Sequence, residues 1–194
     1  PAVFKEYATV FKIGDDPSWA MKVYNDSNWE RSIKHIPEGQ VFWSRTKIDI
    51  LKAPEEYRPY GLQIEAYGEY EIFWDGVLIG KNGNPGQEEE LPIAGELWLT
   101  FSIPTHLTTE GKHVMAVRLS NYYFPDHVGN YELKIAENKD LLVDLLIETS
   151  YMHVYAGAFF IVSIYFLFLF LSNKKAYSTL IFSICCLFVF GLVL

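Results

Sequence analysis

The chain has 194 residues; 50% of them are hydrophobic, 21% are charged, and the formal net charge is -8 at pH 7. Nucleic-acid binding needs clustered Lys and Arg against phosphate, so this acidic balance excludes nucleic acid as a partner. Almost all charged residues lie before the apolar runs at the end of the sequence. The roughly 150 residues that precede those runs are enough for one domain with a hydrophobic core.

Alternating polar and apolar side chains dominate the first part of the chain. In 41–50, for example, Arg45, Lys47 and Asp49 share one face, opposite Ile48 and Ile50. Such period-two patterns indicate strands with one buried face. Strands are therefore predicted within residues 41–50, 62–66, 70–74, 77–79, 97–103, 113–119 and 131–135. Short strands separated by turn residues at these intervals are typical of an antiparallel jelly-roll sandwich, which we predict for residues 1–138.

The turn between two of these strands has its own signature. Asp75-Gly76 joins residues 70–74 to residues 77–79. Gly adopts positive φ without steric cost, and Asp tolerates it, so a type I′ turn and a β-hairpin are predicted here.

Residues 139–150 change period. Their leucines form one stripe, while Asp140, Asp144 and Glu148 form another at a spacing of four. This spacing is that of an amphipathic helix that would lead into the next segment. Because short apolar runs are ambiguous, a final strand followed by a linker is the alternative.

Two uncharged runs end the sequence. They predict a transmembrane helical hairpin, with a first helix over 151–172, a loop over 173–176 and a second helix over 177–194. Lys174 and Lys175 are the only charged residues after Glu148, and they lie in the loop. The positive-inside rule therefore places the loop in the cytoplasm and the sandwich outside it. The lipid bilayer is the first expected partner.

The two ends of the sequence and its cysteines add to this picture. The second run reaches Leu194 without a polar flank, so we expect the chain to continue into further membrane and cytoplasmic parts. An exported domain that begins at Pro1 implies a signal segment that was removed or trimmed. Cys185 and Cys186 both lie in the second run, and the lack of disulfides in the exported domain favours a bacterial periplasm and inner membrane.

Several phrases resemble the galactose-binding-like jelly roll, a sugar-binding sandwich that also occurs beside glycosidase catalytic domains. In order along the chain they are Ile13-Gly-Asp-Asp-Pro-Ser-Trp-Ala20, Asn25-Asp-Ser-Asn-Trp-Glu30, Val41-Phe-Trp-Ser-Arg45, the hairpin 70–83, and Phe101-Ser-Ile-Pro104 with 111–118. Asn25 stands where that group usually has Asp. The resemblance covers most of residues 13–120 and implies a carbohydrate ligand.

The stretch from Tyr165 to Leu194 resembles the first two spans of the bacterial seven-transmembrane receptors with diverse intracellular signalling modules. In that family an exported sandwich precedes seven helices and a cytoplasmic kinase, cyclase or phosphatase. The resemblance implies five further spans and an output domain.

No catalytic constellation is recognised in the residues present, so they are not expected to form an enzyme, and no cofactor is expected. The run Glu88-Glu89-Glu90 lies in a Gly- and Pro-rich loop, where a solvated surface is the simpler interpretation. Asp15 and Asp16 offer oxygen ligands of the kind that calcium prefers, and the alternative is that they cap a turn.

Ligand binding is the remaining chemistry, since sugars stack on aromatic rings while polar side chains bind their hydroxyls. Trp43 and Arg45 share a strand face and either line a groove or form a structural stack. The loop after residue 120 is the other candidate, and its alternative role is to cover one end of the sandwich. Its candidate ligand-binding residues are Asn121, Tyr122, Tyr123, Asp126 and His127.

We therefore expect a signalling receptor whose exported sandwich senses a ligand, with carbohydrate as the implied class, and passes the signal through the membrane helices. A second copy of the chain is a further expected partner. The alternatives are a membrane-tethered carbohydrate-binding or adhesion module without signalling, and the accessory domain of a membrane-anchored glycosidase. Sandwich folds host many functions, so the sequence leaves these open.

Overall fold

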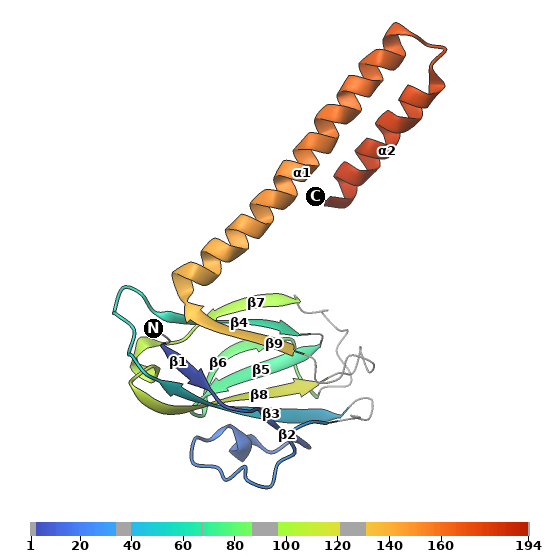
Figure 1. Ribbon diagram of the computed structural model, residues 1–194. Coiled ribbons are helices and arrows are strands. Elements are labelled where there is room, and N and C mark those ends of the chain that lie inside the picture. The colour runs from blue at the N-terminus through green and yellow to red at the C-terminus, as the bar shows by residue number, and fades with distance from the viewer. Residues whose placement is uncertain (1–2, 34–39, 67, 87–96, 121–130, 194) are drawn as a thin grey trace. The chain divides into compact units, whose positions relative to one another are not determined.

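The computed structural model describes residues 3–33, 40–66, 68–86, 97–120 and 131–193 (Figure 1). The chain divides into two units, Pro1–Leu141 and Leu142–Leu194. The first is formed mainly by antiparallel strands and the second by helices, as the composition change along the sequence predicts.

The first unit is a β-sandwich of two antiparallel sheets, which confirms the predicted fold class at that level. The larger sheet has the order β1-β3-β8-β5-β6, and β2 also pairs with β3; the smaller sheet has the order β7-β4-β9. The strands of the larger sheet are β1 (Phe4–Glu6), β2 (Val10–Ile13), β3 (Val41–Ile50), β5 (Glu69–Trp74), β6 (Val77–Asn82) and β8 (Gly111–Ser120). Those of the smaller sheet are β4 (Tyr60–Ala66), β7 (Trp98–Ser102) and β9 (Tyr131–Glu137), and two short 3-10 helices are η1 (Pro17–Ala20) and η2 (Thr105–Leu107).

The predicted hairpin turn is confirmed. Asp75 has φ 50° and Gly76 has φ 90°, the positive values that a type I′ turn requires. Asp75 also accepts hydrogen bonds from the backbone N–H of Val114 (2.8 Å) and the Nζ of Lys22 (2.9 Å). The turn is thus fixed to the neighbouring strand β8 as well as to residues near η1.

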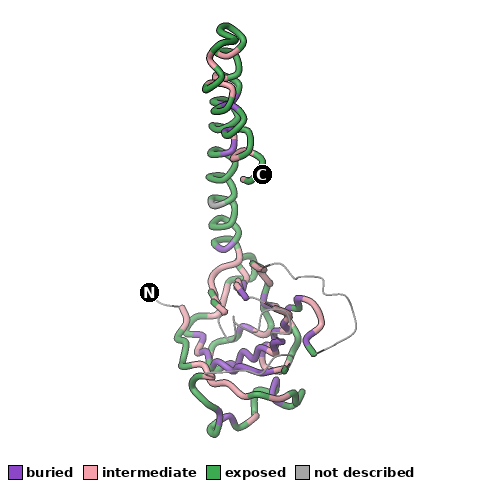
Figure 2. The backbone as a smooth tube through the Cα atoms, turned by 90° about the vertical axis from the view of Figure 1, so that its right-hand side faces the viewer, coloured by how far each residue is buried: buried purple, intermediate pink, exposed green. Residues whose placement is uncertain are grey.

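The main core lies between the two sheets. Alternate residues of β3, β4, β5 and β8 belong to it, and the burial of β5 follows the period of two seen in the sequence. Figure 2 shows buried residues along the strands of the sandwich. Its fully buried members include Phe42, Ile48, Leu62, Ile64, Tyr70, Ile72, Trp74 and Val117.

A second hydrophobic cluster lies on the opposite face of the larger sheet. There Trp43 of β3 stacks on Phe73 of β5 at 5.4 Å between ring centroids, and Trp19 meets Trp29 edge-on at 5.2 Å. Trp19 and Trp29 belong to the segment 14–30, which we call the covering segment. It has little regular secondary structure beyond η1, and these two rings pack it against the sheet, while most of its other residues are exposed.

Arg45 holds the covering segment in place. Its Nε donates to Asp26 Oδ2 at 3.1 Å, and its Nη atoms donate to the backbone carbonyls of Trp19, Met21 (3.1 Å) and Tyr24 (3.4 Å). The guanidinium therefore satisfies both a buried carboxylate and carbonyl groups that no strand or helix pairs.

Replacing Arg45 by Ala would leave Asp26 without its buried partner and would remove one donor from each of the carbonyls of Trp19, Met21 and Tyr24. We expect the free energy of unfolding to fall by about 3–5 kcal/mol. Urea titration of the full chain in detergent micelles, followed by tryptophan fluorescence, measures this, because all 5 tryptophans lie in the sandwich sequence. The control is Arg58→Ala, whose ion pair with Glu137 is half exposed and should contribute below about 1 kcal/mol. Equal losses in the two variants would contradict the role given to Arg45.

The second unit and the end of the first contain two helices, α1 (Asn138–Ser172) and α2 (Tyr177–Val193). α1 covers the residues of both the predicted juxtamembrane segment and the first predicted span. It contains a window of mean hydropathy 2.4 and is, among the described residues, the one helix long and apolar enough to cross a membrane. α2 is shorter, with 17 residues, and contains no charged residue. Lys174 and Lys175 lie in the turn between the helices.

α1 and α2 pack against each other in antiparallel directions. Ser163 Oγ donates to the carbonyl of Ser183 at 2.9 Å, and Ser183 Oγ donates to the carbonyl of Ser163 at 2.8 Å. Small residues at a helix contact allow this close approach, and the reciprocal bonds fix the register. Ring pairs on either side of the serines follow the same register, namely Phe160 with Phe190, Phe166 with Phe182, and Phe170 with Tyr177.

The first turn of α1 packs on the smaller sheet. β9 ends at Glu137 and α1 begins at the next residue; the N–H of Asn138 donates to the carbonyl of Pro59 at 2.9 Å, and the side chain of Leu141 is fully buried. Gly61 of β4 permits this approach, because a Cβ there would lie 2.7 Å from Asn138 Oδ1 and 3.0 Å from Leu141 Cδ1.

Gly61→Ala should therefore push the first turn of α1 away from β4. We expect a loss of about 1–3 kcal/mol in the unfolding free energy of the sandwich, the usual cost of overpacking. The same fluorescence titration measures it. Gly157→Ala serves as the control, because a Cβ at that helical glycine meets nothing within 4 Å. An unchanged transition for Gly61→Ala would show that the turn does not pack there.

Candidate functional site

Two of the residues predicted to bind ligand, Trp43 and Arg45, lie under the covering segment. They do share a sheet face, as the alternation predicts, but each is only 1% exposed. Trp43 is stacked on Phe73, and Arg45 is committed to Asp26 and to backbone carbonyls. The groove interpretation is thus wrong for these two residues, and the structural alternative describes them.

Asp15 and Asp16 have separate structural roles. Asp15 binds Arg118 through both carboxylate oxygens, at 2.7 and 2.6 Å, and also accepts a bond from the Trp43 indole. The Arg118 guanidinium lowers the pKa of Asp15, while partial burial opposes this shift. Asp16 caps η1 by accepting the N–H of Ser18 at 2.9 Å, as the turn-capping alternative predicts.

The other predicted binding residues, Asn121, Tyr122, Tyr123, Asp126 and His127, lie outside the described residues. Their assignment stays a prediction.

Asp75 and His113 form a second polar centre at the hairpin turn. His113 is buried beside Trp74, with its Nδ1 2.7 Å from Asp75 Oδ2 and its Nε2 2.7 Å from the carbonyl of Thr109. Lys22 of the covering segment binds the same Asp75 oxygen. Asp75 therefore joins the turn, strand β8 and the covering segment through charge-assisted hydrogen bonds.

A cavity of about 330 Å³ lies next to this centre and is the candidate functional site. We call it the lysine-lined cavity. β3 and β8 place Lys47, Lys112 and Val114 on one sheet face, since Lys47 pairs with Val114 and Asp49 pairs with Lys112 across the strands. Its lining residues are Tyr7, Lys22, Lys47, Ile48, Lys112, His113 and Val114.

Two of the three lysines are already paired at the cavity. Lys22 binds Asp75, and Lys47 binds Asp26 Oδ1 at 2.6 Å. Burial raises the pKa of Asp26, but hydrogen bonds from Lys47 and Arg45 more than offset this, and the pKa lies below its usual value. Lys112 forms no ion pair within the described part of the chain.

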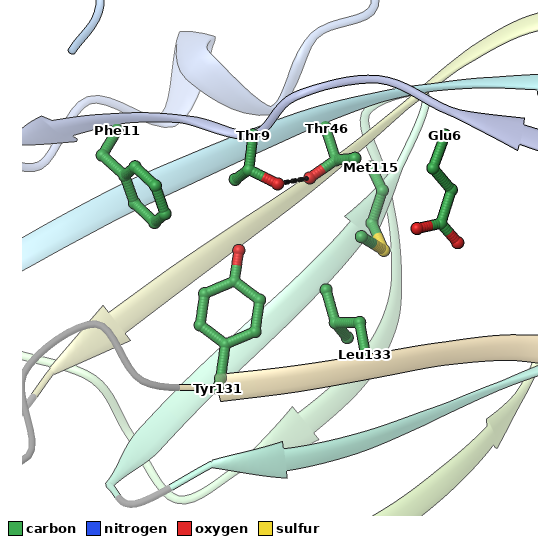
Figure 3. Close-up of a pocket in the computed structure, with 7 residues that line it drawn as sticks. All are labelled: Glu6, Thr9, Phe11, Thr46, Met115, Tyr131 and Leu133. Carbon is green, nitrogen blue, oxygen red and sulfur yellow. Dashed lines mark hydrogen bonds between the residues drawn. The ribbon is translucent and has the colours of Figure 1, made fainter. Parts of the chain in front are cut away.

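A second cavity, of about 210 Å³, lies between the sheets beside β1, β2 and β9 (Figure 3). Its polar groups mostly bind one another: Thr9 Oγ1 is 2.8 Å from Thr46 Oγ1, and the Tyr131 hydroxyl donates to Ser44 Oγ at 2.5 Å. Glu6 is the one charged residue in this lining; it is exposed and forms no ion pair with another described residue. Few groups are left here for a ligand, so the lysine-lined cavity is the stronger candidate.

Sequence reasoning did not single out the lysine-lined cavity. The alternation of β3 places Lys47 and Asp49 on the face that carries Arg45, which is a partial signal. Lys22 and Tyr7 reach the cavity through tertiary contacts, the latter by a hydrogen bond from its N–H to the carbonyl of Lys47 at 2.9 Å. No local pattern encodes such contacts.

Comparison with known proteins finds similarity to parts of solved glycosidase structures. No family model matches the sequence, and no curated protein matches it. Similar solved structures include a glycosyl hydrolase family 2 member from Bacteroides cellulosilyticus DSM 14838 (15% identity, TM-score 0.49, 70% of this chain and 21% of that one). A beta-glycosidase from Bacteroides vulgatus (19%, 0.43, 70% and 20%) and a beta-glucuronidase from Bacteroides uniformis (17%, 0.45, 70% and 18%) are others.

This chain therefore spans about a fifth of each of these three enzymes. All three are glycosidases, and none is a signalling receptor. At such identities and TM-scores the likeness assigns neither activity nor substrate to the chain.

The inter-sheet cavity gives a pH-dependent prediction. Burial raises the pKa of Tyr131 to about 12, although its bond to Ser44 opposes the shift. In the unfolded chain this phenol titrates near its usual value of about 10. The folded state holds the proton more tightly, so the stabilisation is complete below pH 10 and is lost as the pH rises towards about 12.

Tyr131→Phe should lower stability at pH 8 by about 1 kcal/mol, because the variant loses the bond to Ser44. The difference in unfolding free energy between wild type and variant should decrease as the pH rises from 10 to 12. Only the wild type has the phenol of Tyr131, so only the wild type loses its stabilising contribution. Urea titrations at a series of pH values measure this gap, and effects of the other tyrosines cancel in the difference. A constant gap would contradict the assigned burial of the hydroxyl.

Proposed function

We propose that the chain is a membrane-anchored module whose β-sandwich binds a small ligand outside the cytoplasm and serves as an accessory domain rather than as a catalytic one. The observation that carries this proposal is the pairing, in one chain, of a sandwich that bears a polar cavity with helices whose exposed surface is apolar. Soluble proteins rarely expose such a surface, whereas a bilayer covers it.

The helices support the membrane part of the proposal. Aliphatic and aromatic side chains of α1 such as Ile161, Tyr165 and Phe168 are exposed, and those of α2 include Phe188 and Leu192. Backbone polar groups inside an α-helix are satisfied within the helix, as lipid requires. We propose that α1 and α2 form a transmembrane hairpin with Lys174 and Lys175 on the cytoplasmic side, in the inner membrane of a bacterium.

The sandwich supports the binding part. Its finer class in this proposal is the galactose-binding-like jelly roll, and its ligand class is carbohydrate. The lysine-lined cavity falls in the size range of small-molecule sites and combines polar groups with an aromatic side chain. A binding module of this kind would hold a glycan near the membrane for a catalytic domain or a partner protein.

Signal transfer is the second candidate, and one observation favours it. No linker separates β9 from α1, and Asn138 and Leu141 in the first turn of α1 pack against Gly61 of β4. A receptor needs such a connection, because a ligand can act on a distant output only through an element that differs between two states. Under this second proposal the sandwich belongs to a seven-transmembrane receptor. The deciding measurement is whether the activity of its cytoplasmic output domain changes when ligand is added.

The membrane anchor is tested by placing charges on the exposed surface of α1. Ile161 is 68% exposed and Phe168 is 64% exposed. In the double variant Ile161→Arg/Phe168→Arg we expect a marked loss of insertion, since each Arg near the centre of a span costs up to about 3 kcal/mol. The fraction of chain that resists alkaline extraction from membranes measures this.

Val23→Arg is the matched control, because Val23 is 93% exposed but lies in the sandwich unit. It should remain in the membrane fraction as wild type does. If the helix variant is retained as fully as the control, the exposed face of α1 does not meet lipid and the anchor is wrong.

A further inference from the structure

The lysine-lined cavity carries positive charge in a domain that is otherwise strongly acidic. The whole chain has a net charge of -8, and without Lys174 and Lys175 the remainder carries -10. Even so, three lysines from separate parts of the sandwich line this one cavity. They come from the covering segment (Lys22), from β3 (Lys47) and from β8 (Lys112).

These ammonium groups keep donors for a ligand. An ammonium has three N–H donors, so the single ion pair of Lys22 with Asp75, and that of Lys47 with Asp26, each leave two. Lys112 has no ion-pair partner among the described residues, and its cross-strand neighbour Asp49 forms none with it. His113 has no ring nitrogen left for a ligand, because both of them already form hydrogen bonds. Within the described part of the chain, Lys112 is therefore the lysine of this site that pairs with no carboxylate.

The rest of the lining is suited to a ring rather than to a bare ion. Tyr7 is 41% exposed at the cavity, and the buried side chains of Val114 and Ile48 complete the apolar part of its lining. Lys5 approaches the Tyr7 ring at 5.1 Å, which adds another cation beside that ring. The C–H face of a sugar packs on such surface while charged groups hold its substituents.

We propose that the lysine-lined cavity binds a sugar that carries a carboxylate, with Lys112 as the main partner of the carboxylate and Tyr7 in contact with the ring. This proposal rests on the proposed role of the sandwich as a binding module and names its ligand class. Carboxylate is a better match than a neutral hydroxyl, because ammonium donors form their strongest bonds with an ionised acceptor.

The test compares three probes on the full chain in detergent micelles at constant ionic strength: glucuronate, glucose and inorganic phosphate. Ligand-observed NMR titration gives an affinity for each. We expect glucuronate to bind more tightly than either of the others, and Lys112→Ala to weaken it about tenfold. Tyr7→Ala should weaken glucuronate too, with no effect on phosphate. Lys139→Ala is the control, since Lys139 is an exposed lysine outside the cavity, and it should bind as wild type does.

Each other result overturns the assignment. Equal affinity for glucose would show that charge is not recognised, and equal affinity for phosphate would show a plain anion site. Glucuronate binding that Lys112→Ala leaves unchanged would place the ligand elsewhere. A response to neutral glycans on an array without any response to glucuronate would remove the acidic-sugar assignment yet leave the binding module standing. No response to any glycan would remove both. Tryptophan fluorescence of each variant confirms that it is folded.

Discussion

The buried ion pair between Arg45 and Asp26 is the interaction on which the rest of the sandwich depends. A charge in a hydrophobic cluster is costly unless a partner and hydrogen bonds compensate for it. Here Asp26 supplies the charge, and carbonyls of Trp19, Met21 and Tyr24 accept the remaining donors. The covering segment forms few backbone hydrogen bonds of its own. The hydrogen bonds from Arg45 therefore take the place of the backbone hydrogen bonds that would hold a strand in a sheet. The rings of Trp19, Trp29 and Trp43 are buried together in the resulting cluster.

The same network positions the lysine-lined cavity. Asp26 accepts from both Arg45 and Lys47, and Asp75 accepts from Lys22, His113 and the N–H of Val114. Each carboxylate thus links the interior of the sandwich to a lysine at the cavity. The ammonium groups of Lys22 and Lys47 are held before a ligand arrives, which lowers the entropy lost on binding. The covering segment therefore covers the tryptophan cluster and also contributes Lys22 to the lining of the neighbouring cavity.

The strands could be predicted from sequence because their signal is local. In β3 the alternation that assigns Arg45, Lys47 and Asp49 to one face is the pattern that the structure shows, and the Asp75-Gly76 turn follows from backbone preference. What covers that face could not be predicted. Trp43 and Arg45 look the same in sequence whether they line a groove or lie beneath a second layer, since that layer is brought by residues some 20 positions earlier. The cavity depends on the same long-range contacts, and so do the short strands β1 and β2, which are too brief to show a period.

The acidity of the domain constrains how an anionic ligand can reach the cavity. Residues 1–138 contain 13 Lys and Arg against 21 Asp and Glu. A surface of net charge -8 repels anions at long range, but at physiological salt such fields fade beyond about 8 Å. Attraction by Lys112 and its neighbours is then felt only close to the cavity, so electrostatic steering contributes little to association. Affinity has to come from contact, from the Tyr7 ring and from lysines already held in position. Such a site favours ligands that are abundant near the membrane over rare ones captured from a distance, which is consistent with the proposed anchored accessory domain rather than with a scavenger of dilute anions.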